Sequence, residues 1–120
     1  MIHRALFYAA ALLAIGMNNS FAASFDCAKA QRPLEKLICS NPQLNSADEQ
    51  MGHIFKEINA SFPLKGFALL TQRRFIAEYP TCMLDGKGKA VATPATANAC
   101  LQMVQSRTNE LRQYGQSKVY

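Results

Sequence analysis

Residues 24–44, which decide the fold, read SFDCAKAQRPLEKLICSNPQL. They contain two of the four cysteines and two of the five prolines in the chain. Pro33 disfavours a helical conformation at Arg32, so this stretch is not expected to form one continuous helix. We predict instead a short turn capped by Asp26, whose carboxylate can accept hydrogen bonds from free N–H groups, followed by a separate helix over 33–39.

The same break determines how the cysteines can pair. Within one straight helix, Cys27 and Cys39 would lie about 18 Å apart, which is too far for a disulfide. A bend at Pro33 lets Cys27 fold back onto Cys39, so we predict that these two residues are linked. The second predicted disulfide joins Cys82 to Cys100 and closes the loop between the last two helices. A link from Cys27 to either of these later cysteines would contradict the prediction.

The N-terminus has the pattern of a secretory signal peptide. A short cationic start precedes an apolar run over 5–17, and small residues up to Ala22 suit signal peptidase, so cleavage is expected before Ala23. A membrane-spanning helix needs about 20 apolar residues, so a transmembrane anchor is disfavoured. We therefore expect residues 1–22 to be removed, leaving a single domain, 23–120. That domain is expected to be periplasmic or secreted, with no stable insertion into a membrane.

Composition narrows the class of protein further. Without Arg4 the chain has 12 Lys+Arg against 8 Asp+Glu, a formal charge of +4. The basic residues are scattered, so no nucleic-acid interface is expected. Four cysteines in a small exported chain are typical of a disulfide framework, and zinc is disfavoured because no pair has the C-x-x-C spacing. His53 is the one histidine left after cleavage, and no nucleophile motif is present, so neither an enzyme nor a cofactor or metal site is expected.

Apolar periodicity predicts three longer helices after the crosslinked stretch. Pro42 is expected to end the short helix, and a capping box of Ser46 with Glu49 is expected to start the next one, over 47–61. Asp48, like Glu49, is interpreted as a carboxylate that favours the start of this helix. The apolar stripe has the 3.6-residue spacing of a helix and consists of Ala47, Met51, Ile54, Phe55, Ile58 and Phe62.

The third and fourth helices are predicted over 64–79 and 95–113, with Pro80 ending the third and Thr93 capping the fourth. The inward residues of the third are Leu64, Ala68, Leu69, Phe75, Ile76 and Tyr79. Those of the fourth are Ala97, Cys100, Leu101, Val104, Thr108 and Leu111. Gln72 falls within the third helix's stripe, where a buried amide needs hydrogen-bond partners.

These elements predict an all-α fold. It is expected to be a small antiparallel bundle of three main helices plus a short N-terminal helix, stapled by two disulfides. Between the last two helices, residues 85–89 read Asp-Gly-Lys-Gly-Lys. The spacing of a phosphate-binding loop is absent, so this segment is interpreted as an exposed loop with two solvated lysines.

The opening stretch also resembles a known family, the N-terminal domain of LprI-type lysozyme inhibitors. The resemblance lies in Phe-Asp-Cys-Ala-Lys-Ala at 25–30 and Glu-Lys-Leu-Ile-Cys-Ser-Asn-Pro-Gln-Leu at 35–44. It is looser at 72–75, where Gln-Arg-Arg-Phe stands for the family's Gln-Arg-x-Trp, and at 79–80, where Tyr-Pro stands for Arg-Asp. Cys-Leu at 100–101 also matches the family's pattern. The resemblance implies a small exported helical protein that binds lysozyme.

Two functions follow as hypotheses. The first is an exported lysozyme-inhibitor-like protein that binds a protein partner and blocks the cleft of a muramidase. Common lysozymes are themselves cationic, so a chain at +4 gains nothing from long-range attraction and would have to insert a specific loop, such as 84–93. The second is a small periplasmic binding, adaptor or immunity-type protein with a non-lysozyme partner. The candidate binding residues are Gln72, Arg73, Phe75, Leu84, Asp85, Lys87 and Lys89.

Overall fold

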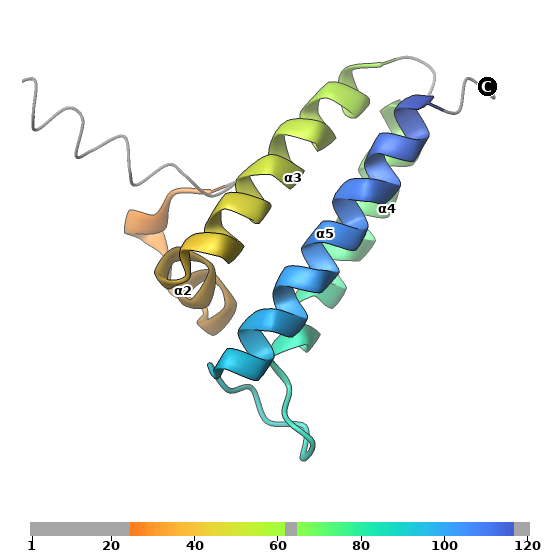
Figure 1. The fold of residues 1–120 in the computed structure, drawn as a ribbon. Helices are drawn as coiled ribbons and strands as arrows, with labels where there is room; N and C mark the ends of the chain where they lie inside the picture. Colours follow the sequence, from red (N-terminus) through yellow and green to blue (C-terminus); the bar gives the residue numbers. More distant parts are fainter. Residues whose placement is uncertain (1–24, 62–64, 117–120) are drawn as a thin grey trace, which may run out of the picture.

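The computed structural model describes residues 25–61 and 65–116, which form an all-α bundle (Figure 1). Its elements are η2 (Cys27–Lys29), α2 (Pro33–Ser40), α3 (Pro42–Ala60), α4 (Lys65–Glu78), η3 (Tyr79–Met83) and α5 (Pro94–Gln116), where η marks a 3-10 helix. α4 runs antiparallel to α3 and α5, and α2 packs beside the start of α3 (Figure 1). The predicted fold is confirmed. The predicted signal peptide, 1–22, lies outside the described residues.

The bend predicted at Pro33 is present. The Asp26 carboxylate accepts a backbone hydrogen bond at 2.9 Å and starts η2. Pro33 occupies the first turn of α2, and Glu35 accepts hydrogen bonds from the backbone N–H groups of Arg32 and Gln31, at 3.0 and 3.2 Å. These two bonds favour the ionised carboxylate and lower the pKa of Glu35.

Both predicted disulfides are confirmed. Cys27–Cys39 joins η2 to α2, and Cys82–Cys100 joins η3 to α5. They link positions 12 and 18 residues apart. A crosslink of this kind stabilises a small domain by about 2–4 kcal/mol, largely because it restricts the unfolded chain. The N-terminal turn and the loop before α5 are thereby each held against a helix.

α3 begins at Pro42, earlier than predicted. The Asn41 side chain accepts a hydrogen bond from the backbone N–H of Leu44 at 2.9 Å, and Pro42 fills the first helical position. Asn41 therefore ends α2 and starts α3, so the Asn-Pro pair is a start signal as well as a stop. The predicted capping box of Ser46 with Glu49 is wrong, because both residues lie within the helix.

Asp48 is also not a helix-start carboxylate, because it lies in the core with a side chain that is 1 % exposed. Its carboxylate accepts a hydrogen bond from the Tyr79 hydroxyl at 2.9 Å, which joins α3 to η3. Burial raises the pKa of Tyr79 far above its ordinary value of 10.0, and the neighbouring negative charge of Asp48 adds to this effect. The tyrosine is thus held in its protonated, hydrogen-bonding form.

A testable consequence concerns alkaline pH. Below the ordinary tyrosine pKa the Tyr79 phenol is protonated in both the folded and the unfolded chain. Above it only the unfolded chain loses the proton, so the free energy of unfolding should fall as the pH rises past about 10. Tyr79→Phe should remove this part of the pH dependence. It should also leave the phenolate absorbance of the folded protein near pH 11 unchanged. If the substitution lowers this absorbance by the contribution of one tyrosine, Tyr79 is ionised in the folded protein and the raised pKa is contradicted.

α4 has apolar side chains around most of its circumference, so the sequence predicts its inner face only in part. Ala68, Phe75 and Tyr79 are buried as predicted. Leu69 and Ile76 are 37 % and 52 % exposed, so their predicted inward placement is wrong. The buried positions follow a spacing of three and four residues along one side, and these two residues fall beyond its edge.

The amide of Gln72 is buried as predicted, and its partner comes from α5. Arg107 is 5 % exposed and donates from Nε to Gln72 Oε1 at 2.8 Å, and from Nη2 to Thr71 Oγ1 at 2.9 Å. Its guanidinium also pairs with Glu110 and lies 5.6 Å from the ring centroid of Tyr114. This network ties α4 to α5, and the sequence did not predict the burial of Arg107.

α5 runs the length of the bundle and supplies much of the core. The helix is slightly longer at both ends than predicted. Five of its six predicted inward residues are buried, and Leu101 is half-buried. On the facing side of α3, Met51 and Ile58 are buried, and Ile54 and Phe55 are half-buried. The helical spacing therefore gave the inner faces of α3 and α5 correctly.

Candidate binding loop and its neighbouring pocket

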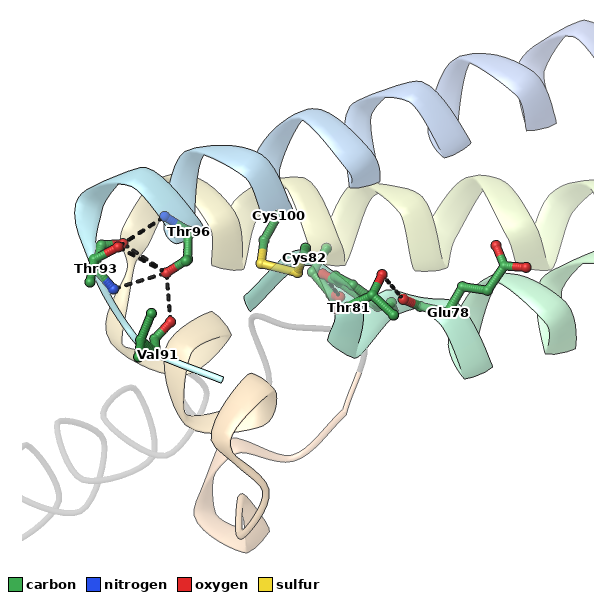
Figure 2. Close-up of a disulfide and its surroundings, with 9 residues drawn as sticks. Glu78, Thr81, Cys82, Val91, Thr93, Thr96 and Cys100 are labelled. Atoms are coloured by element: carbon green, nitrogen blue, oxygen red, sulfur yellow. Dashed lines mark hydrogen bonds between the residues drawn. A yellow bond between two sulfur atoms is a disulfide. The ribbon is translucent and has the colours of Figure 1, made fainter. Parts of the chain in front are cut away.

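Residues 84–93, here called the tethered loop, connect η3 to α5 and project beyond the end of the bundle (Figure 1). The Cys82–Cys100 disulfide lies at the base of the loop and links the elements on its two sides (Figure 2). Cys100 is fully buried, so the base of the loop is attached directly to the core.

A network of hydrogen bonds folds the tip of the tethered loop into a turn. The Asp85 carboxylate accepts from the backbone N–H groups of Lys87 and Lys89, at 2.8 and 2.9 Å. Leu84 and Ala90 form an isolated antiparallel bridge across the turn. Residue 88 is a glycine with φ +81°, a conformation that other residues rarely adopt. The exposed loop predicted from composition therefore has a defined backbone.

The end of the loop that leads into α5 is fixed as well. Thr93 Oγ1 accepts a hydrogen bond from the backbone N–H of Thr96 at 3.1 Å, so the predicted cap is confirmed. The Thr96 hydroxyl donates to the carbonyl oxygen of Val91 at 2.7 Å (Figure 2). Thr96 is itself 7 % exposed and belongs to the first turn of α5. Hydrogen bonds and a disulfide thus hold both ends of the loop.

The structure brings four of the seven candidate binding residues together in the tethered loop and separates the other three. Those in the loop are Leu84, Asp85, Lys87 and Lys89. Leu84 is 45 % exposed and both lysines are exposed, whereas Asp85 is half-buried and bonded to the turn. Arg73 is exposed on α4. Gln72 and Phe75 are each 8 % exposed, so they contribute to the interior rather than to a shared surface with the loop.

An apolar pocket of about 380 Å³ lies beside the base of the loop, between α2, the end of α4 and η3. It is lined by Phe25, Arg32, Pro33, Leu34, Glu35, Ile38, Asp48, Ile76, Tyr79, Pro80, Met83 and Ala90. Ala90 belongs to the tethered loop, so loop and pocket form one continuous surface. The sequence did not predict this pocket, because its walls come from segments far apart in the chain.

A second groove of about 570 Å³ lies between α4 and α5 and is more polar. Arg107 and Glu110 line it but pair with each other, and Thr71 and Tyr114 bond to the same guanidinium. These groups are already used to join the two helices, so the tethered loop and its pocket are the stronger candidate site. Within residues 25–61 and 65–116, no group of three or more His, Cys, Asp or Glu side chains is placed to hold a metal ion.

Comparisons with known proteins do not assign this site. No family model, curated protein or solved structure matches the chain. The resemblance of residues 25–44 to LprI-type inhibitors therefore stays a prediction, and a function has to be inferred from the loop and the pocket themselves.

Proposed function

We propose that this chain is an exported inhibitor that inserts the tethered loop into the substrate cleft of a muramidase. The observation that carries the proposal is the fixed backbone of an exposed, lysine-bearing loop. A loop that is already ordered loses little conformational entropy on binding, and this raises affinity. The Asp85 turn, the bridge beneath it and the Cys82–Cys100 disulfide all supply that order.

The charge of the loop suits such a cleft. Most glycoside hydrolases use a pair of Asp or Glu carboxylates at the scissile bond. Lys87 and Lys89 flank the glycine at the tip of the turn, and the Asp85 carboxylate is turned toward the backbone rather than toward a partner. Two ammonium groups can therefore approach two carboxylates. This local attraction counters the long-range repulsion expected between two cationic proteins.

The neighbouring pocket supplies a second, apolar contact. Hot spots of protein interfaces are often single apolar or aromatic side chains that fill a pocket on the partner. The pocket is walled by Leu34, Ile38 and Met83 and meets the loop at Ala90. An apolar side chain from the rim of the muramidase cleft would occupy it when the loop enters.

The two disulfides support the proposal that the protein is exported. Two structural disulfides with no free cysteine among the described residues are typical of proteins that mature in an oxidising compartment. We propose that the compartment is the periplasm or the extracellular medium, and that the product starts at Ala23. This location would place the protein where muramidases act on the cell wall.

The experiment is a lysis assay. The protein exported from its full-length chain is added to cell-wall suspensions with several types of muramidase, and the rate of lysis is followed. Lys87→Gln with Lys89→Gln should weaken inhibition by about a hundredfold, since each lost charge-assisted contact contributes about 1.5 kcal/mol or more. The matched control removes two exposed charges elsewhere, Lys56→Gln on α3 with Arg112→Gln on α5, and should inhibit like the wild type.

Two results would refute the proposal. One is a lack of inhibition of every muramidase type by the wild-type protein. The other is an equal loss of inhibition in the loop variant and in its matched control, which would show that only net charge matters.

A second candidate function is an adaptor for a non-muramidase protein of the envelope. The apolar lining of the pocket favours it, because such a pocket accepts a side chain from any partner of suitable shape. A pull-down from envelope extract separates the two functions. Recovery of one stable partner without muramidase activity would support the adaptor, provided that Ala90→Lys, at the exposed rim of the pocket, abolishes the recovery.

A further inference from the structure

The outer side of α4 is unusually apolar for a solvent-facing helix. Among the described residues, five large apolar side chains are exposed, and four of them lie on this helix. They are Phe67 at 51 %, Leu69 at 37 %, Leu70 at 64 % and Ile76 at 52 %. At 3.6 residues per turn they span about half of the helix circumference, with Leu70 between the other three. Clustered exposed apolar residues of this kind mark interaction surfaces.

The charges within the apolar arc of the same helix are basic. Arg73 and Arg74 are exposed and lie within the apolar arc. The sequence of α4 contains no acidic residue before Glu78, its last position. A helix side that combines Phe and Leu with basic residues is typical of segments that lie in the interface of a membrane rather than across it. Arginine stems add to the apolar contact while their charged ends reach the headgroups.

The charges also disfavour a dimer in which a second copy of the chain covers the outer side of α4. A symmetric dimer would place the same surface on both sides of the interface. Arg73 and Arg74 of one copy would then face, or lie close to, the same residues of the other, and the acidic residue of α4, Glu78, lies at the edge of this side in the last position of the helix. An anionic lipid surface offers the opposite charge. Within the described ranges no helix is long and apolar enough to cross a bilayer, so the contact would be peripheral.

We propose that the outer side of α4 docks on membranes rich in anionic phospholipid headgroups. Phe67, Leu70 and their apolar neighbours would enter the boundary between headgroups and acyl chains. Arg73 and Arg74 would bind phosphate groups. The tethered loop lies outside this surface, which meets the neighbouring pocket only at Ile76, so variants of the loop lysines and of Arg73 and Arg74 test the two proposals separately.

The chain has no tryptophan, so a single reporter can be placed on this surface. Leu70→Trp, in the full-length chain exported and purified as above, should show a blue shift of its emission with phosphatidylglycerol vesicles. Phosphatidylcholine vesicles should give no shift, and high salt should reverse the shift because it screens charge. The control reporter is His53→Trp on α3, a side chain that is 67 % exposed in the native protein, and it should not shift.

Sedimentation with the same vesicles tests the charges without relying on the reporter. Arg73→Gln with Arg74→Gln should weaken binding to phosphatidylglycerol vesicles by about thirtyfold. Lys56→Gln with Arg112→Gln, which changes the net charge equally, should weaken it much less. Lys87→Gln with Lys89→Gln should also bind vesicles well even though it has lost inhibition. The proposal is overturned if wild-type protein does not bind anionic vesicles, or if the two charge-matched variants lose binding equally. It is also overturned if sedimentation velocity without lipid shows a dimer that Leu70→Asp dissociates.

Discussion

Replacing Cys82 and Cys100 together with alanine is expected to lower the free energy of unfolding by about 3 kcal/mol, because the disulfide closes an 18-residue separation in the unfolded chain. Cys100 is fully buried, so alanine at this position also leaves a small unfilled space next to the core. Chemical unfolding of the oxidised proteins measures this change. A loss below about 1 kcal/mol would show that the crosslink is not a main source of stability.

The same substitution should also reduce muramidase inhibition, since it frees the base of the tethered loop. The comparison is the double alanine variant at Cys27 and Cys39, whose disulfide spans a separation of 12 residues. That variant should lose a similar amount of stability but much less inhibition, when both are assayed at a temperature where they remain folded. Equal losses of inhibition would mean that the loop does not depend on its disulfide.

The second large effect is expected at Arg107. Arg107→Met keeps an unbranched apolar stem but removes every donor, so the buried Gln72 amide loses its partner. We expect the free energy of unfolding to fall by about 2–3 kcal/mol, most of it from that amide. The contact with Glu110 should add little, because the Glu110 side chain is 52 % exposed and its charge is screened by solvent.

A double-mutant cycle separates the hydrogen bond from general damage to packing. Gln72→Met combined with Arg107→Met removes both partners, and such paired replacement should cost much less than the sum of the two single changes. Strictly additive losses in chemical unfolding would show that the two side chains do not stabilise each other.

Local rules explain why so much of the fold follows from the sequence. Pro33 forces a bend, the bend makes Cys27–Cys39 feasible, and both are present in the structure. The inner faces of α3 and α5 follow from a single apolar stripe on each. The stripe predicted on α4 is ambiguous, since Leu69 and Ile76 are as apolar as the residues that the helix buries. Only packing against the other helices decides which side faces inward.

Contacts between polar groups that are far apart in the chain could not be predicted from the sequence. The sequence predicts that Asp48 is a helix-start carboxylate, but Asp48 is buried and hydrogen-bonded to Tyr79, 31 positions later. The sequence predicts that the Gln72 amide needs a hydrogen-bond partner, yet no local pattern indicates that Arg107 supplies it. The candidate site shows the same limit. Composition predicts an exposed loop over 85–89, whereas its fixed backbone and the neighbouring pocket arise from contacts between distant segments.

The mode of inhibition in the lysis assay tests the central proposal most directly. If the tethered loop occupies the substrate cleft, wild-type protein should compete with an oligosaccharide fragment of the cell wall for the muramidase, and the Lys87→Gln Lys89→Gln variant should compete about a hundredfold less well. Binding of the protein and the oligosaccharide to the enzyme at the same time, or competition unchanged in the loop variant, would contradict the account.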